Sequence, residues 1–147
     1  MATDQLENIP SSKSETPAAA LVREFNEAFE NPKDPALWRS LIREETAEVT
    51  QAAANLLKEL CDLVYVMEGA QWAGVDIETL GAQTLANILV LFRLYGKAFS
   101  DAQFTEAFKR VHASNMSKLV DGKPLRREDG KVLKGPNYKA PDLIDII

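Results

Sequence analysis

The residues best suited to chemistry in this sequence are two groups of carboxylates in neighbouring helical segments. The first group is Glu44, Glu45 and Glu48, and the second is Glu59 and Asp62. Successive residues of an α-helix are rotated by about 100°, which places each group on an apolar stripe instead of a polar outer face. Several negative charges can be buried together only if cations accompany them. A hard divalent ion with oxygen ligands, such as Mg²⁺, would meet that requirement.

The apolar stripes are defined by residues at helical spacing from the acids. Leu37, Leu41 and Ala52 share the face of the first group, and Val66 and Ala70 share the face of the second. Basic residues that could neutralise the acids stand nearby but leave the stripes themselves without a cation: Arg39, Arg43 and Lys58. The alternative is that the acids lie at the rim of two ordinary bundle helices. Periodicity leaves both interpretations open.

The elements that must position these acids are expected to be helices. Apolar periodicity and the breaks at Gly and Pro predict helices over about 17–29, 35 to the low 50s, 57–73, 77–99 and 101–116. No segment shows sustained alternation, so the predicted fold is an all-α bundle of four to five helices. Residues 1–16 are polar and predicted to be disordered. The stretch 118–147 is rich in Gly and Pro and predicts an irregular C-terminal arm to a single domain at 17–147.

Composition narrows the class of protein. A chain of 147 residues with 46% hydrophobic and 27% charged residues suits one globular domain. The net charge of −5 argues against nucleic acid as a partner. A single cysteine, Cys61, cannot form a disulfide within the chain. The polar N-terminal residues predict no signal peptide, and no run is long enough to span a bilayer. We therefore expect a cytoplasmic protein that does not bind membranes.

Three stretches of the sequence resemble a known family. Residues 43–48 match an EExxE motif, residues 59–62 match the ExxD motif that follows it, and the segment from Val111 to Leu143 is similar to the tail of one subgroup. Together they resemble the MazG-like all-α NTP pyrophosphohydrolases, which include dUTPase-like and phosphoribosyl-ATP pyrophosphohydrolase-like branches. The resemblance covers about 21–74 and 103–143.

The resemblance implies hydrolysis of a nucleoside triphosphate to a monophosphate and pyrophosphate. The substrate would be a dNTP or a non-canonical NTP, in a house-cleaning role, with dUTP or dCTP as the first guess. The cofactor would be Mg²⁺, with Mn²⁺ as the alternative. The implied metal ligands are Glu45, Glu48, Glu59 and Asp62. Either Glu44 or Glu45 would activate the attacking water.

Substrate contacts are expected from the arm and from the first helices. Between Lys118 and Lys139 the chain has seven basic and three acidic residues, whereas the remainder has 10 basic and 19 acidic residues. A basic arm on an acidic body suits a triphosphate. The predicted substrate-binding residues are Asn26, Trp38, Asn115, Lys118, Lys131 and Lys134. The alternative for the arm is a solvated tail that packs across a subunit.

Two features depart from the family pattern. Only ten residues separate Glu48 from Glu59, and on one continuous helix these two would lie about 16 Å apart. Either a tight hairpin at 52–55 brings the acids together, or the two helices run on as one and the site forms with a partner subunit. Residues 76–102 look like an insertion, and their apolar helix is a candidate interface for a homodimer or homotetramer. The rival function is a catalytically silent helical interaction module on the same scaffold.

Overall fold

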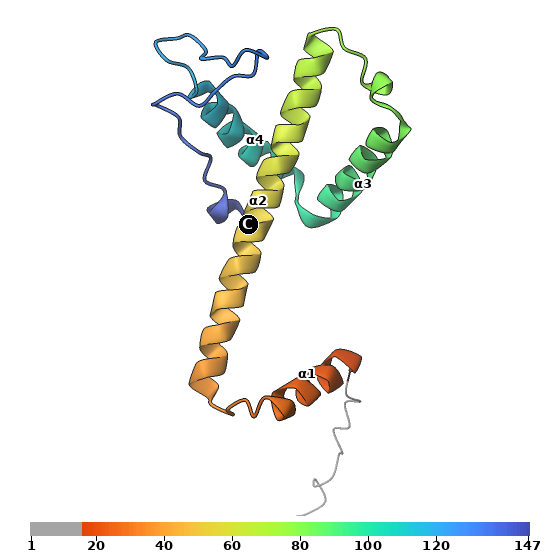
Figure 1. Ribbon diagram of the computed structural model, residues 1–147, viewed down its shortest axis with the longest axis vertical. Helices are drawn as coiled ribbons and strands as arrows, with labels where there is room; N and C mark the ends of the chain where they lie inside the picture. Colours follow the sequence, from red (N-terminus) through yellow and green to blue (C-terminus); the bar gives the residue numbers. More distant parts are fainter. Residues whose placement is uncertain (1–15) are drawn as a thin grey trace, which may run out of the picture. The chain divides into compact units, whose positions relative to one another are not determined.

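The chain is all-helical in the part that the structure, a computed structural model, describes, which is residues 16–147. Its α-helices are α1 (Pro17–Ala28), α2 (Pro35–Trp72), α3 (Ala82–Ala98) and α4 (Asp101–Met116) (Figure 1). A 3-10 turn, η1 (Ile77–Leu80), lies between α2 and α3, and a second, η2 (Ile144–Ile146), follows the C-terminal arm. The β pairing in this part consists of isolated bridges, Val120 with Lys123 and Arg126 with Val132. The predicted all-α class is confirmed. None of the helices in this range is long and apolar enough to cross a membrane.

The chain divides into two compact units between Leu41 and Ile42. The first unit contains α1 and the start of α2, and the second contains all five carboxylates, the hydrophobic core and the C-terminal arm. The prediction of one domain at 17–147 stays a prediction. Apart from Thr16, the segment predicted to be disordered lies outside the described residues.

The helix starts of the first unit follow local capping signals. The Ala19 amide donates to Thr16 Oγ1 at 3.1 Å, with Pro17 at the first helical position. The Ala36 amide donates to Asp34 Oδ1 at 2.9 Å, which begins α2 as the Asp-Pro pair predicts. The apolar face of α1 is present but uncovered within this unit, since Leu21, Phe25 and Phe29 are all exposed.

The helix α2 corrects the predicted break between two helices. A tight turn was one expectation for 52–55, but α2 continues unbroken from Pro35 to Trp72. The physical reason is local. Alanine has the highest helix propensity of any residue type, and three alanines stand in a row at Ala52-Ala53-Ala54 with no Gly or Pro among them. The second of the two alternatives, one continuous helix, is the one the structure has.

The hydrophobic core lies in the second unit, against the C-terminal half of α2. Figure 1 shows α3 and α4 beside this half of the helix. Leu57 and Cys61 of α2 and Val111 of α4 are the largest fully buried side chains. Ala54, Leu60, Phe99, Ala107 and Leu143 complete the buried cluster. Leu143 shows that the chain returns to the core after the arm. The core covers only one side of this part of α2, because Glu59 and Val66 are exposed.

Two junctions position α3 and α4. Gly81, with φ +86°, separates η1 from α3, so the predicted helix over 77–99 is in fact two elements. That backbone region is open to Gly at little cost. The start of α4 carries a full capping box, in which Ser100 and Gln103 each bond the other's backbone amide. The predicted helix over 101–116 is confirmed to the residue.

The arm folds back along α4 through specific contacts. Gln103 Nε2 donates to the Ile146 carbonyl at 2.8 Å, and Arg110 pairs with Asp145, its Nη1 lying 2.6 Å from Oδ1. At Gly135 the chain passes so near Val120 that an added Cβ would lie 2.6 Å from Val120 Cγ2. These contacts hold the arm beside the end of α4, where its basic residues can line a cavity.

Candidate metal and phosphate site

The continuous α2 turns the two carboxylate groups into one stripe. Glu48 and Glu59 lie only about 20° apart around the helix axis but about 16 Å apart along it. The same geometry places this stripe roughly opposite Leu57 and Cys61, which face the chain's own core. The acids therefore share a face of α2, as predicted, and that face is not the one the core covers.

The structure does not bury or assemble the acids within one chain. Glu44, Glu45, Glu48 and Glu59 are exposed and Asp62 is half-buried. In residues 16–147 no three His, Cys, Asp or Glu side chains come together in a group that could hold a metal ion. The cause is the missing turn, because one straight helix keeps its two pairs of ligands about 16 Å apart. Of the two arrangements that the sequence left open, the one that assembles all the acids within a single chain is not the one found in residues 16–147.

Lys58 neutralises the second group of acids. Its Nζ lies 2.7 Å from Asp62 Oδ2 and 2.9 Å from Glu59 Oε1. The hydrogen bond to Asp62 is the main cause that raises the pKa of Lys58 above its ordinary value, and burial opposes it. The oxygen atoms that a metal would need at this end of α2 are thus held by an ammonium group, whereas Glu45 and Glu48 form no ion pair within residues 16–147.

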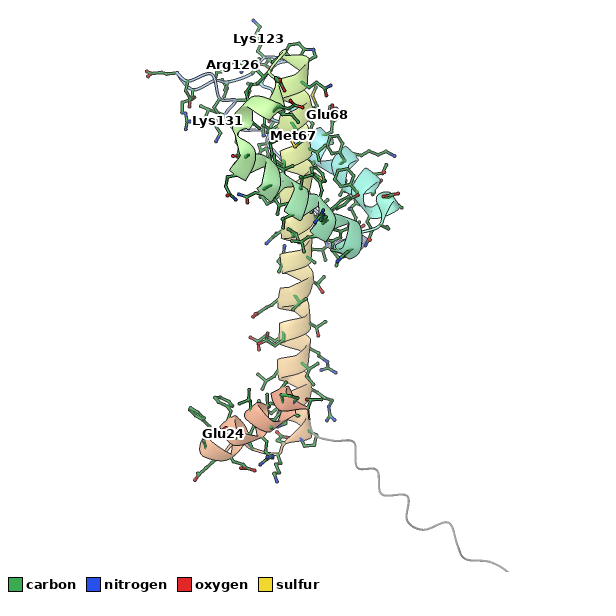
Figure 2. All side chains as sticks on the ribbon, turned by 90° about the vertical axis from the view of Figure 1, so that its right-hand side faces the viewer. Glu24, Met67, Glu68, Lys123, Arg126 and Lys131 are labelled. Carbon is green, nitrogen blue, oxygen red and sulfur yellow. The ribbon has the colours of Figure 1, made fainter. Side chains whose placement is uncertain are left out.

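A cavity of about 700 Å³ joins α2 to the end of α4 and the arm. Its volume is in the range of small-molecule sites. It brings together four of the predicted site residues, Asp62, Asn115, Lys118 and Lys131. Its other lining residues are Tyr65, Val66, Met116, Leu119, Pro124, Arg126 and Val132. Figure 2 shows Arg126 and Lys131 together in the arm, near the end of α2 that carries Met67 and Glu68.

The polar contacts around this cavity fix some of its groups. Lys118 Nζ donates to Asn115 Oδ1 at 2.6 Å, which holds both side chains at the end of α4. The Tyr65 hydroxyl lies 3.1 Å from His112 Nδ1 and links α2 to α4. One carboxylate, Asp62, thus faces the same space as three cationic side chains. That combination can hold a metal ion and polyanionic phosphate next to each other.

Two lining residues were missed by the sequence analysis. Neither Arg126 nor Tyr65 was among the predicted substrate-binding residues. Tyr65 stands three residues after Asp62, a spacing that places both on neighbouring parts of one helix surface. That signal could have been found. The position of Arg126 depends on the fold of the arm, which no periodic pattern specifies.

Lys134 and the two residues proposed for the base lie elsewhere. The Lys134 ammonium lies over the Tyr138 ring, 4.7 Å from its centroid, and does not line the cavity. Asn26 and Trp38 line a separate cavity of about 690 Å³ within the first unit. There Asn26 Oδ1 accepts from Asn31 Nδ2 at 2.7 Å, and the Trp38 indole donates to the Pro32 carbonyl at 2.8 Å. Because the indole N–H of Trp38 is used in this hydrogen bond, Trp38 would contact a ligand through the face of its ring.

Comparison with known families gives the class of protein. The chain matches the model of the phosphoribosyl-ATP pyrophosphohydrolase family over residues 9–83, just over half its length, and belongs to that family. The match includes both carboxylate groups of α2 and all of the first unit from residue 9. Membership implies an all-α hydrolase that releases pyrophosphate from a nucleotide. No curated protein and no solved structure matches the chain.

Proposed function

We propose that this protein hydrolyses a nucleoside triphosphate to a nucleoside monophosphate and pyrophosphate, with Mg²⁺ as the cofactor and Mn²⁺ as a substitute. The substrate would be a dNTP or a non-canonical NTP, and the role would be house-cleaning of the nucleotide pool. Family membership supports the pyrophosphohydrolase class. The choice of a triphosphate rests on the cavity at the end of α2.

The observation that carries this proposal is the pairing of Asp62 with three cations around one cavity. Lys118, Arg126 and Lys131 would contact the negatively charged phosphates, and Asn115 would donate to a phosphate or sugar oxygen. Phosphoryl transfer needs positioning and charge neutralisation more than covalent chemistry from the protein. A cavity with one carboxylate and several cations supplies these two needs.

The carboxylates of α2 fit Mg²⁺ by their chemistry. Glu45, Glu48, Glu59 and Asp62 offer hard oxygen donors, which are the ligands that Mg²⁺ and Mn²⁺ prefer. The ion would supply positive charge to the phosphate oxygens at the bond that breaks. Glu44 or Glu45 would accept the proton of the attacking water. Asn26 and Trp38 are proposed to read the nucleobase, Asn26 by hydrogen bonding and Trp38 by stacking.

The second candidate is a catalytically silent interaction module. The unbroken α2 favours it, because a single chain does not bring its four ligands together. This candidate keeps the fold and the exposed helix faces but predicts no turnover.

The experiment that separates the two is a pyrophosphate-release assay. The purified full chain is incubated with Mg²⁺ and a panel of canonical and modified NTPs and dNTPs, with phosphoribosyl-ATP included because of the family name. We expect release with at least one nucleoside triphosphate. No release from any member of the panel would refute the proposed function, and release from phosphoribosyl-ATP alone would refute the choice of substrate.

A site variant tests the ligands within the same assay. Glu48→Gln should abolish turnover and weaken Mg²⁺ binding while the helix content measured by circular dichroism stays unchanged. The matched control is Glu68→Gln, an exposed glutamate of the same helix that lies about 200° around the axis from Glu48. Turnover equal to wild type in Glu48→Gln would refute the metal assignment.

A further inference from the structure

Tyr65 is a half-buried aromatic residue in the lining of the cavity between α2, the end of α4 and the arm. The proposed function gives roles to Asp62, Asn115 and the three cations of this cavity but none to Tyr65. A phenol hydroxyl can donate a hydrogen bond, and the oxygens of a phosphate chain accept such bonds. The hydroxyl of Tyr65 is therefore a further group that could bind a ligand here.

Two side chains of α4 hold the ring of Tyr65. Its centroid lies 5.7 Å from that of Phe108 and 6.0 Å from that of His112, two residues that are four positions apart on α4. The Tyr65 ring thus lies across one turn of α4. Its hydroxyl oxygen is also fixed, 3.1 Å from His112 Nδ1. A side chain held at both its ring and its hydroxyl loses little freedom when a ligand binds.

The contact between Tyr65 and His112 joins two helix surfaces that both continue along the cavity. Asp62 stands three residues before Tyr65 on α2, and Asn115 stands three residues after His112 on α4. Residues three apart are neighbours on a helix surface, so the contact lies beside Asp62 on one helix and beside Asn115 on the other. Asn115 Oδ1 in turn accepts from Lys118 Nζ at 2.6 Å. Tyr65 is thus a neighbour of residues that the proposed function gives to the metal and the phosphates.

The hydroxyl of Tyr65 has one proton, and the tautomer of His112 decides where this proton points. If Nδ1 of His112 carries no proton, the hydroxyl donates to it and has no proton left for a ligand. If Nδ1 carries a proton, the ring donates to the Tyr65 oxygen and the hydroxyl can donate elsewhere. A phosphate oxygen in the cavity would be the second acceptor. Phosphate binding therefore favours two successive hydrogen bonds, from His112 to Tyr65 and from Tyr65 to phosphate.

We propose that Tyr65 is a phosphate-binding residue and that His112 is a positioning residue that directs the hydroxyl proton of Tyr65 into the cavity. The ligand class is a polyphosphate chain, because three cationic side chains line the same cavity. The phosphate as part of a nucleotide rests on the proposed function, whereas the pair of residues rests on the contact between α2 and α4. His112 acts only through the hydroxyl of Tyr65.

Binding of inorganic tripolyphosphate tests the hydroxyl without any turnover. Tyr65→Phe removes the oxygen and keeps the ring that packs on Phe108. We expect its dissociation constant for tripolyphosphate, measured by calorimetry in the presence of Mg²⁺, to rise about tenfold, as for loss of a hydrogen bond to a charged group. The matched control Tyr138→Phe, in an arm tyrosine that does not line this cavity, should bind as the wild type does. An unchanged dissociation constant in Tyr65→Phe would overturn the proposal, as would a wild type that does not bind tripolyphosphate.

A double-mutant cycle tests whether His112 acts through Tyr65. His112→Ala should weaken tripolyphosphate binding about three- to tenfold. His112→Asn should restore most of the affinity, because its amide nitrogen is attached to Cγ as Nδ1 is. In the Tyr65→Phe background His112→Ala should have no further effect. An equal loss of affinity in both backgrounds would show that His112 acts without Tyr65, which would overturn its positioning role.

The tautomer of His112 can be observed directly, because His112 is the only histidine in the sequence. Nitrogen-15 NMR distinguishes a ring nitrogen with a proton from one without. We expect tripolyphosphate to increase the fraction of His112 that carries a proton on Nδ1, and Tyr65→Phe to abolish this change. An Nδ1 that stays without a proton in the saturated complex would overturn the proposed direction of the hydrogen bonds.

The results for this pair can be told apart from those for the proposed function. If tripolyphosphate binding depends on the Tyr65 hydroxyl while no nucleotide releases pyrophosphate, the polyphosphate site stands and the proposed function is refuted. If the wild type releases pyrophosphate while Tyr65→Phe leaves both KM and kcat unchanged, the proposed function stands and the role of Tyr65 is refuted.

Discussion

The second group of acids on α2 can bind either the ammonium of Lys58 or a metal ion. This ammonium occupies one oxygen of Asp62 and one of Glu59, and these are two of the atoms proposed to bind Mg²⁺. Hydrogen bonding to Asp62 raises the pKa of Lys58, so the lysine stays charged at any pH near neutrality. A charged lysine at this place competes with the metal.

Replacing Lys58 by Gln should therefore tighten Mg²⁺ binding in the absence of nucleotide. Partly exposed ion pairs contribute roughly 0.2–1 kcal/mol, which corresponds to an affinity about 1.4- to 5-fold higher after the lysine is removed. Titration calorimetry of the wild type and of Lys58→Gln measures this change, and Lys109→Gln on α4 serves as the control. Weaker Mg²⁺ binding in Lys58→Gln would show that the lysine supports the site instead of competing for it.

Cys61 gives a probe of the core at the scale of one residue. Its side chain is fully buried, and burial, assisted by the charge of Asp62, raises the pKa of its thiol to about 11 from the ordinary value of 9.0. The neutral thiol is thus the form that the fold stabilises. This contribution to stability is complete below about pH 9 and is lost as the pH rises through 11.

Native protein at pH 8 should consequently react slowly with a thiol-specific disulfide reagent. The thiolate is the reactive form, and it is both scarce and covered here. We expect the rate to rise at least a hundredfold in denaturing urea, and urea melts at pH 8 and pH 10.5 should show lower stability at the higher pH. Prompt, stoichiometric labelling of the native protein would contradict the packing of Cys61 against α4.

At the scale of elements, local signals predicted the helix ends better than the turn that matters for the site. The predicted helix starts at Pro17, Pro35 and Asp101 are confirmed. The hairpin at 52–55, one of two alternatives, depended on bringing distant acids together, and the high helix propensity of the alanines favours the other, a continuous helix. Whether residues far apart in the sequence meet depends on the whole fold, and the sequence of one helix does not indicate it.

In the candidate site too, residues on or next to helices could be predicted more readily than residues of the arm. Asp62, Asn115 and Lys118 could be named from motifs and meet around one cavity, because they lie on or next to the regular elements α2 and α4. The arm residues were harder, since Lys131 lines the cavity and Lys134 lies on Tyr138 instead. Basic composition predicts that an arm binds phosphate but does not say which of its lysines points inward.

The alternative in which α2 forms the metal site with a partner subunit predicts different effects from inserting one residue and inserting seven. A single Ala inserted after Thr50 rotates the first pair of acids by about 100° relative to the second, which removes both from a common face. A duplication of residues 49–55 adds one heptad and keeps the two pairs of acids in phase to within about 20°. We expect the one-residue variant to lose Mg²⁺-dependent pyrophosphate release and the seven-residue variant to keep it.

Helix content by circular dichroism serves as the control for both insertions, since both lie before Leu57 and the core. Equal pyrophosphate release by the two variants would show that the phase of the two pairs of acids on α2 does not govern the site.

At the scale of the whole molecule, charge is divided between a basic arm and an acidic remainder. The stretch from Lys118 to Lys139 has a net charge of +4, whereas the rest of the chain has −9. The basic side chains that line the cavity, such as Arg126 and Lys131, are exposed, so their attraction for phosphate is screened by salt. Binding of a triphosphate should depend on ionic strength more than the chemical step does.

Lys131→Ala should therefore raise KM about three- to tenfold with a smaller effect on kcat, since an exposed charge contributes about 1 kcal/mol to binding. It should also flatten the rise of KM between 50 and 500 mM salt. Lys123→Ala is the matched control, because Lys123 belongs to the same arm but does not line the cavity. A change in kcat alone, or an equal effect of Lys123→Ala, would remove Lys131 from the substrate site.

The unbroken α2 has a consequence for how the amount of protein relates to its output. If each catalytic centre is completed by a neighbour, the number of working centres at low abundance grows with the square of the chain concentration instead of in proportion to it. Halving the supply of chains then removes about three quarters of the activity. Because α2 lacks a turn at this point, turnover would be low below a threshold concentration of the chain and would rise steeply above it.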